Sequence, residues 1–236
     1  MKILSIIPAR GGSKGLPKKN ILDLAGKPLI AWTIEASLSS KYITKTIVSS
    51  DDKEILDISK QYGAAIVERP DGLSSDVATS ESVAEHAINY LESMGEIFDI
   101  VIFLQPTSPL RGSKDIDSAF KTMFDSCATA VISTCEFDNK ILKTFIENSN
   151  GFLEGSSKNK YPFVRRQDLP LVYMPNGAIY IVSIESFKKV NSFLTSKTVN
   201  YIMPEDRSID IDSQDDLIEI QKILVKAFVG QAQHPI

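Results

Sequence analysis

The first twenty residues contain the grouping of side chains that most clearly suggests chemistry. The apolar run Ile3–Pro8 leads directly into a loop with three glycines, Gly11, Gly12 and Gly15. Glycine permits positive φ angles and lets backbone N–H groups come close to a ligand. The loop also holds four basic residues and no acidic one: Arg10, Lys14, Lys18 and Lys19. In a chain of net charge −4, this predicts a site for a polyanion such as a nucleoside triphosphate, against the alternative of a solvated basic loop.

The loop differs from the two familiar phosphate-binding motifs. A Walker A loop requires G-x-x-x-x-G-K-[ST], and the dinucleotide fingerprint requires G-x-G-x-x-G. The sequence after Gly11 matches neither pattern. Kinases and dehydrogenases are therefore disfavoured.

A second candidate group is the acidic segment Ser208–Asp212, SIDID. The alternation of isoleucine and aspartate predicts the end of a strand, with Asp210 and Asp212 on one face at roughly 7 Å. Two carboxylates so placed repel unless a cation lies between them, and Mg²⁺ is commonly bound by one or two carboxylates together with substrate phosphates. The alternative is the solvent-facing side of an edge strand.

A third group is the loop LQPTSPLR, which follows the apolar run Ile100–Leu104. Two prolines make this loop rigid, and Gln105, Thr107 and Ser108 offer neutral hydrogen-bonding groups that suit a polyhydroxylated substrate. Arg111 ends the loop, and a structural role for it is as well supported as a functional one.

The segment 136–173 is more polar than the rest of the chain and has no strong helical period. We interpret it as an excursion from the sheet, either a flap or a dimer arm. It carries Lys143, Arg166 and Gln167. The cations Lys143 and Arg166 are either solvated or brought onto the triphosphate by movement of this arm.

The remaining chain alternates between strand-like and helix-like segments. Strands are predicted at Ile3–Pro8, Lys45–Ser50, Ala65–Glu68, Ile100–Leu104, Ala130–Ser133, Pro175–Val182 and Val199–Pro204. Helices are predicted at Leu29–Ser37, Lys53–Tyr62, Ser80–Ser93, Lys114–Phe124 and around Leu217–Leu224. Such alternation predicts a single α/β domain over 1–236, a doubly wound, mostly parallel sheet with ligands at the carboxyl ends of its strands.

Composition narrows the possible partners and location. A net charge of −4 argues against nucleic acid or an anionic membrane as the main partner. The two cysteines, Cys127 and Cys135, do not have the spacing of metal ligands, and their small number fits a reducing cell compartment. We expect both side chains to be buried in the protein. The chain starts with a core strand rather than a signal peptide, and no apolar run is long enough to cross a membrane. We therefore expect a cytoplasmic protein.

Taken together, the motifs resemble those of the CMP-sialic acid synthetases, or acylneuraminate cytidylyltransferases. The matching motifs, in order, are IPARGGSKGLPKKN, GKPLIAWTIEAS, SSDD, ERPDGLSSDVATS, LQPTSPLR, RRQDLPLVYMPNGAIYI and SIDID. The resemblance implies a Rossmann-like nucleotidyltransferase fold, a homodimer with a dimerisation region near 136–173, and Mg²⁺ as cofactor. It also implies transfer of CMP from CTP to the anomeric hydroxyl of a nonulosonic acid, with release of pyrophosphate.

The same resemblance assigns roles to individual residues. Those matching nucleotide-binding positions are Arg10, Ser13, Lys14, Lys19, Asn20, Arg69 and Ser80. Those matching positions near the sugar or phosphate are Gln105, Lys143, Arg166 and Gln167. Asp210 and Asp212 match the metal-binding pair. Arg10, Lys14 and Lys19 would neutralise the leaving pyrophosphate, and Asp212, acting through the metal, is the candidate general base.

Two other readings remain open. A related nucleotidyltransferase could act on a legionaminic-, pseudaminic- or octulosonic-type acid, or use another nucleoside triphosphate, with the same loops. A non-catalytic module could bind CTP without releasing pyrophosphate.

Overall fold

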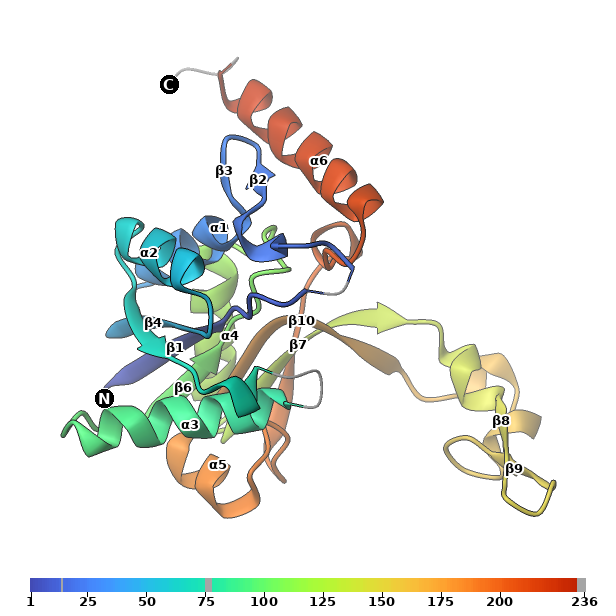
Figure 1. The fold of residues 1–236 in the computed structure, drawn as a ribbon. Helices are drawn as coiled ribbons and strands as arrows, with labels where there is room; N and C mark the ends of the chain where they lie inside the picture. Colours follow the sequence, from blue (N-terminus) through green and yellow to red (C-terminus); the bar gives the residue numbers. More distant parts are fainter. Residues whose placement is uncertain (14, 75–77, 233–236) are drawn as a thin grey trace.

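A seven-stranded sheet forms the centre of the computed structural model, which describes residues 1–13, 15–74 and 78–232 (Figure 1). Its strands are β1 (Ile3–Pro8), β4 (Lys45–Ser50), β5 (Ala65–Glu68), β6 (Ile100–Phe103), β7 (Ala130–Phe137), β10 (Val172–Ser183) and β11 (Thr198–Ile202). They lie in the order β11-β7-β10-β6-β1-β4-β5. All neighbouring pairs are parallel except those made by β10, which runs antiparallel to β6 and β7.

Helices cover both faces of the sheet. They are α1 (Leu29–Leu38), α2 (Lys53–Gln61), α3 (Ser80–Ser93), α4 (Ser113–Asp125), α5 (Ile184–Val190) and α6 (Gln214–Ala232). One buried cluster joins α1, α2 and α4 to the sheet, and a second joins α3 and α5 to the other face. In β1, Ile3 and Ile7 belong to the first cluster whereas Leu4 and Ile6 belong to the second, as expected for a central strand with alternating side chains.

The α/β architecture with a mostly parallel sheet is confirmed, and most predicted elements lie within a few residues of their expected bounds. The chain also forms elements that the sequence analysis did not predict: α5, the hairpin of β2 (Asp23–Leu24) and β3 (Lys27–Pro28), and the hairpin of β8 (Phe145–Glu147) and β9 (Leu153–Gly155).

A third, smaller apolar cluster lies outside the sheet, where α6 packs beside the β2–β3 hairpin (Figure 1). It contains Leu16 from the glycine-rich loop, Ile211 from the acidic segment, and Leu217 and Ile220 from α6. Burial of these side chains therefore holds the two candidate site segments together, although they lie at opposite ends of the chain.

The acidic segment is not a strand, so that prediction was wrong. Residues 208–212 have no regular secondary structure, and the edge strand β11 ends before them at Ile202. The two isoleucines that alternate with the aspartates, Ile209 and Ile211, pack in the third cluster rather than on a sheet. The alternation of apolar and acidic residues in this segment thus reflects burial of every second side chain, although the segment does not pair with a strand.

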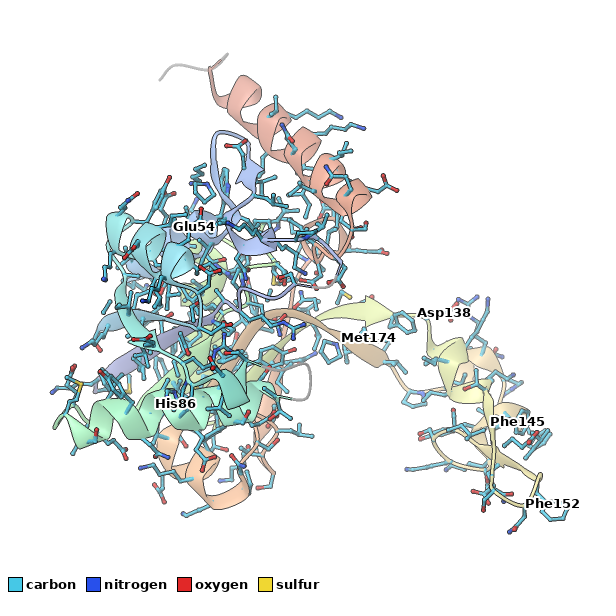
Figure 2. All side chains as sticks on the ribbon, in the orientation of Figure 1. Glu54, His86, Asp138, Phe145, Phe152 and Met174 are labelled. Atoms are coloured by element: carbon cyan, nitrogen blue, oxygen red, sulfur yellow. The ribbon has the colours of Figure 1, made fainter. Side chains whose placement is uncertain are left out.

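A long arm projects from the body. The strands β7 and β10 continue beyond the sheet and lead into residues 138–171, which carry the β8–β9 hairpin (Figure 1). Figure 2 shows Phe145 and Phe152 far out on this arm, and both are exposed.

The cysteine prediction was also wrong, because Cys127 is exposed and Cys135 is only half-buried. Cys127 lies in the turn that ends α4, with a φ of 49°, outside the helix face that packs on the sheet. Within the described part of the chain, no helix is both long and apolar enough to cross a membrane.

Candidate active site

A cavity of about 450 Å³ opens at the carboxyl ends of β1 and β6, beside the N-terminus of α3. Polar residues from distant parts of the sequence line it: Arg10, Ser13, Lys19, Asn20, Arg69, Thr79, Ser80, Gln105, Thr107 and Asp212. The carboxyl edge of a parallel sheet is where α/β proteins bind ligands. The structure therefore brings together most of the predicted nucleotide residues with Gln105 and one of the two aspartates.

The glycine-rich loop is held against the start of α2. The backbone N–H of Gly11 donates to Asp51 Oδ1 at 3.1 Å, and a Cβ at Gly11 would lie 2.7 Å from Asp52 Oδ2. The buried Asn20 donates from Nδ2 to the carbonyl of Arg10 at 3.0 Å, so this side chain braces the loop from within. Lys14 lies outside the described residues, and its predicted role stays a prediction.

Adjacent lysines in this loop point to different places. Lys19 lines the cavity, and its Nζ donates to the carbonyl of Ile211 at 2.7 Å and to Asp212 Oδ1 at 3.1 Å. Lys18 instead pairs with Glu54 at 2.5 Å on the surface. This difference follows from the left-handed backbone of Lys18, whose φ is 54°. Of these two cations, only Lys19 belongs to the site.

The two aspartates of the acidic segment have different environments. Asp212 is exposed at the rim of the cavity, whereas Asp210 is half-buried. Burial raises the pKa of the Asp210 carboxyl; the hydroxyl of Thr107 opposes this shift, and the charge of Asp212 adds to it.

The aspartate pair fits a divalent cation. Asp210 Oδ1 is buried and, within the described residues, has no hydrogen-bond partner, while Asp212 is near enough for its charge to act on Asp210. A cation would satisfy both observations. No group of three or more acidic, histidine or cysteine side chains that could hold a metal exists among the described residues, at this pair or elsewhere. One or two carboxylates are enough for Mg²⁺ when substrate phosphates complete its coordination.

Arg69 is a buried cation at the wall of the cavity. Its Nη2 donates to the carbonyl of Ser49 at 3.2 Å and its Nη1 to that of Leu73 at 3.3 Å. Burial lowers the pKa of the guanidinium; Asp51 opposes this effect and the nearby Arg10 adds to it. The positive charges of Arg10 and Arg69 repel each other. An anionic ligand in the cavity would reduce this repulsion, so the cavity favours such a ligand.

The proline-containing loop after β6 supplies the wall opposite Arg69. Gln105 and Thr107 line the cavity, and Gln105 packs against Gly177, where a Cβ would lie 3.1 Å from its Oε1. Gly177 has a φ of 74° and lies in the irregular stretch of β10. A side chain at this position would therefore displace Gln105.

Arg111 has a structural position. It is 1% exposed, and its Nη2 donates to Thr33 Oγ1 at 2.9 Å and to the carbonyl of Gln105 at 3.3 Å. Burial lowers the pKa of Arg111 to about 10, and Asp115 partly offsets that effect. The guanidinium thus holds the loop of Gln105 onto α1, which decides between the two roles that the sequence left open.

Three predicted residues lie away from the cavity. Lys143, Arg166 and Gln167 are all on the arm, where Lys143 Nζ donates to the carbonyl of Val164 at 2.9 Å. Arg166 and Gln167 line a separate hollow at the base of the arm, and Arg166 lies 3.6 Å from Asp138. Within one chain, the structure does not bring these side chains to the site.

Two residues that support the site were not predicted from the sequence. Thr79, the N-cap of α3, lines the cavity and accepts from the backbone N–H of Ser82. Asn176 is buried and donates to Ser208 Oγ at 2.9 Å, which ties the acidic segment to β10. The turn-forming Asn-Gly pair within the predicted strand Pro175–Val182 was the available signal, because such a pair marks an irregularity.

Comparisons with known proteins identify a family for this chain. A family model described as cytidylyltransferase matches residues 4–226. The pseudaminic acid cytidylyltransferase of Campylobacter jejuni is 36% identical over 227 residues, which cover 96% of this chain and 97% of the relative. The CMP-N,N'-diacetyllegionaminic acid synthase of Legionella pneumophila is 35% identical over 95% of this chain and 97% of the relative. The N-acylneuraminate cytidylyltransferase of Streptococcus agalactiae is 37% identical over 93% of this chain but 52% of the relative.

A solved structure of CMP:2-keto-3-deoxy-manno-octonic acid synthetase, in complex with CTP, has a similar fold. Its TM-score is 0.70, and the match covers 96% of this chain and all of that chain. At 17% sequence identity this likeness concerns the fold.

Proposed function

Because this chain belongs to the cytidylyltransferase family, we propose that it transfers CMP from CTP to the anomeric hydroxyl of a nonulosonic acid. The oxygen of the anomeric hydroxyl forms a bond to the α-phosphorus of CTP, and the bond from that phosphorus to the bridging oxygen breaks as pyrophosphate leaves. The hydroxyl gives up its proton, for which Asp212 is the proposed acceptor. The observation that carries the proposal is the cavity itself, a space of about 450 Å³ that Arg10, Lys19 and Asp212 line together. Relatives named for CMP transfer to three different acids support it.

The residues around the cavity have complementary tasks in this reaction. Arg10 and Lys19 neutralise charge that develops on the pyrophosphate, and Lys14 is proposed to act with them. Arg69, Asn20 and Ser80 bind the nucleoside end, with Ser13 on the phosphates. Gln105 donates to or accepts from the sugar hydroxyls. Because little covalent chemistry falls to the protein, catalysis depends mostly on placement.

Magnesium belongs to the same proposal. Asp210 and Asp212 would hold it, since they are the paired carboxylates beside the phosphate loop. When bound, the ion would supply positive charge to the phosphates and act as a Lewis acid. Lys19, which contacts Asp212 at 3.1 Å, keeps that carboxylate next to the phosphate loop.

The test is pyrophosphate release, measured with each of four nucleoside triphosphates and a panel of nonulosonic acids. The panel contains sialic, pseudaminic, legionaminic and octulosonic types, because the identities of 35–37% to the named relatives do not separate these acids. We expect release with CTP and at least one of the nine-carbon acids. Binding of CTP without release in the presence of any acid would instead indicate a non-catalytic nucleotide-binding module.

We further propose a cytoplasmic homodimer in which the arms pair. The arm exposes several large apolar side chains, including Phe163 at 83%, Leu171 at 73% and Phe152 at 69%. Several exposed apolar side chains on one projecting segment favour burial of that segment against a partner. In a dimer of this kind, the arm would also bring Lys143 and Arg166 toward the other protomer.

The dimer proposal is tested with Phe163→Ser, which removes apolar area at the arm. Light scattering is expected to show a dimer for the wild type and a shift toward monomer for this variant. Leu194→Ser is the matched control, because Leu194 is 65% exposed on the body rather than the arm. A wild-type protein that remains monomeric at high concentration would refute the proposal.

A further inference from the structure

Asp115 is almost fully buried at the start of α4, and its carboxylate joins three separate segments. Oδ2 accepts from the backbone N–H of Gly112 at 3.0 Å, which caps the helix. Oδ1 accepts from the hydroxyl of Tyr201 in β11 at 3.0 Å. The guanidinium of Arg207 lies 2.9 Å from Oδ1 and 2.7 Å from Oδ2. A buried carboxylate with this many donors holds its partners in defined places.

Arg207 connects this carboxylate to the acidic segment. It is the last residue of the short 3-10 helix Glu205–Arg207, and Asp210 follows three residues later. Its ion pair with Asp115 therefore fixes the start of the segment that carries both site aspartates. Neither Arg207 nor Asp115 lines the cavity, so any effect they have on the reaction is indirect.

The same carboxylate acts on the opposite wall of the cavity. Its charge stabilises the buried guanidinium of Arg111, which in turn donates to the carbonyl of Gln105 at 3.3 Å. The two walls also meet directly, because the backbone N–H of Ile211 donates to the carbonyl of Thr107 at 2.9 Å. Asp115 is thus linked to the loop 105–111 through Arg111, and through Arg207 to the residue that precedes the segment 208–212.

We propose that Asp115 and Arg207 are positioning residues that set the spacing between the loop 105–111 and the segment 208–212. This inference rests on the proposed function, since the spacing matters when Asp210 and Asp212 act on a nucleotide. The ion pair keeps the aspartates facing the phosphate loop and leaves the nucleotide contacts themselves unchanged. Its loss lowers turnover more than nucleotide affinity.

The experiment compares Arg207→Met with the wild type by two independent measurements. Amide hydrogen exchange of residues 205–213 is expected to become at least ~10-fold faster, while β1 and β6 remain protected. The kcat for pyrophosphate release is expected to fall about 10-fold or more, with KM for CTP within ~3-fold. Arg207→Lys, which keeps the charge, is expected to recover most of kcat. If Arg207→Met does not fold, Asp115→Asn takes its place, because the amide is equal in size.

Lys188→Met is the matched control. Lys188 pairs with Glu92 at 2.6 Å, and its side chain is 47% exposed, compared with 39% for Arg207. Unchanged exchange in residues 205–213, or a loss of kcat that Lys188→Met shares, would overturn the inference. An inactive wild type would refute the proposed function alone, because the exchange measurement requires no turnover.

Discussion

A Cβ atom at Gly15 would lie 2.6 Å from the carbonyl oxygen of Asp212. This distance is shorter than any van der Waals contact of a real side chain, so the glycine-rich loop and the acidic segment touch at a point where only glycine fits. The contact is continued by Leu16 and Ile211, which share a buried cluster, and by Lys19, which reaches the carbonyl of Ile211. The two halves of the site are thus one packed unit.

Replacement of Gly15 by alanine is expected to separate these halves. The neighbouring atom is backbone, which cannot rotate away, and a shift of about 1 Å costs up to ~100-fold in rate when a reaction depends on placement. We expect kcat/KM for pyrophosphate release to fall about 10- to 100-fold, with KM for CTP also raised. Gly12→Ala is the control, since no atom of the described residues, apart from its chain neighbours, lies within 4 Å of the Cβ position. Equal rates for the two variants would contradict the argument.

The two adjacent lysines of the loop give a second prediction. Lys19→Met removes a cation that lines the cavity and contacts Asp212, and kcat/KM is expected to fall by about 100-fold. Lys18→Met removes only a surface pair with Glu54, so its rate is expected to stay within about twofold of the wild type. Steady-state kinetics at saturating acid measure both. A larger loss for Lys18→Met than for Lys19→Met would show that the loop is oriented differently in the active enzyme.

The acidic pair gives a third prediction. Asp210→Asn and Asp212→Asn are each expected to reduce turnover by at least about 100-fold at limiting Mg²⁺. Folding should not suffer, because burial opposes ionisation of Asp210 and Asp212 is exposed. Asp215→Asn is the control, because Asp215 is an exposed residue in the first turn of α6. Full activity of either site variant at low Mg²⁺ would refute the metal assignment, and thermal unfolding checks that all three variants are folded.

A fourth prediction concerns the pH dependence of stability. His86 lies on α3 (Figure 2), where burial lowers the pKa of its imidazole below the ordinary 6.5 and the charge of Arg69 lowers it further. The folded state therefore binds this proton less tightly than the unfolded state. The contribution of His86 to the free energy of unfolding is complete above pH 6.5. It is lost progressively as the pH falls from 6.5 toward the lowered pKa of the folded state.

The measurement is urea unfolding of the wild type and of His86→Gln at several pH values between about 5 and 8. The variant is expected to lose less stability than the wild type on acidification, because glutamine does not titrate. Other groups titrate in both proteins, so the difference between the two curves is the informative quantity. Parallel curves would show that His86 has the same pKa in the folded and unfolded states.

Much of the fold was accessible from the sequence because its signals are local. The strands Ile3–Pro8, Lys45–Ser50 and Ala65–Glu68 and the helix Ser80–Ser93 have the predicted bounds, since each is an apolar run or helical period flanked by turn residues. The short hairpin of β2 and β3 was missed. Two-residue strands carry no period, and this hairpin packs through Leu24 into the cluster that also contains α6.

The candidate site was predicted less completely. The residues of the glycine-rich loop, together with Arg69, Ser80 and Gln105, follow strand ends or begin a helix, and the parallel sheet collects such positions at one edge. Lys143, Arg166 and Gln167 lie on the arm instead, and whether a second copy brings them to a site depends on association between chains.

The sequence by itself determined most of the longer strands and helices and which loops carry charge, because side-chain type and spacing act within a few residues of one another. Tertiary structure decided what no local pattern encodes. It placed the antiparallel β10 beside β6, buried Arg111 under the loop of Gln105, and brought Asp212 against Gly15. The physical reason is that these contacts join residues far apart in the chain, whose proximity depends on burial of the whole apolar core.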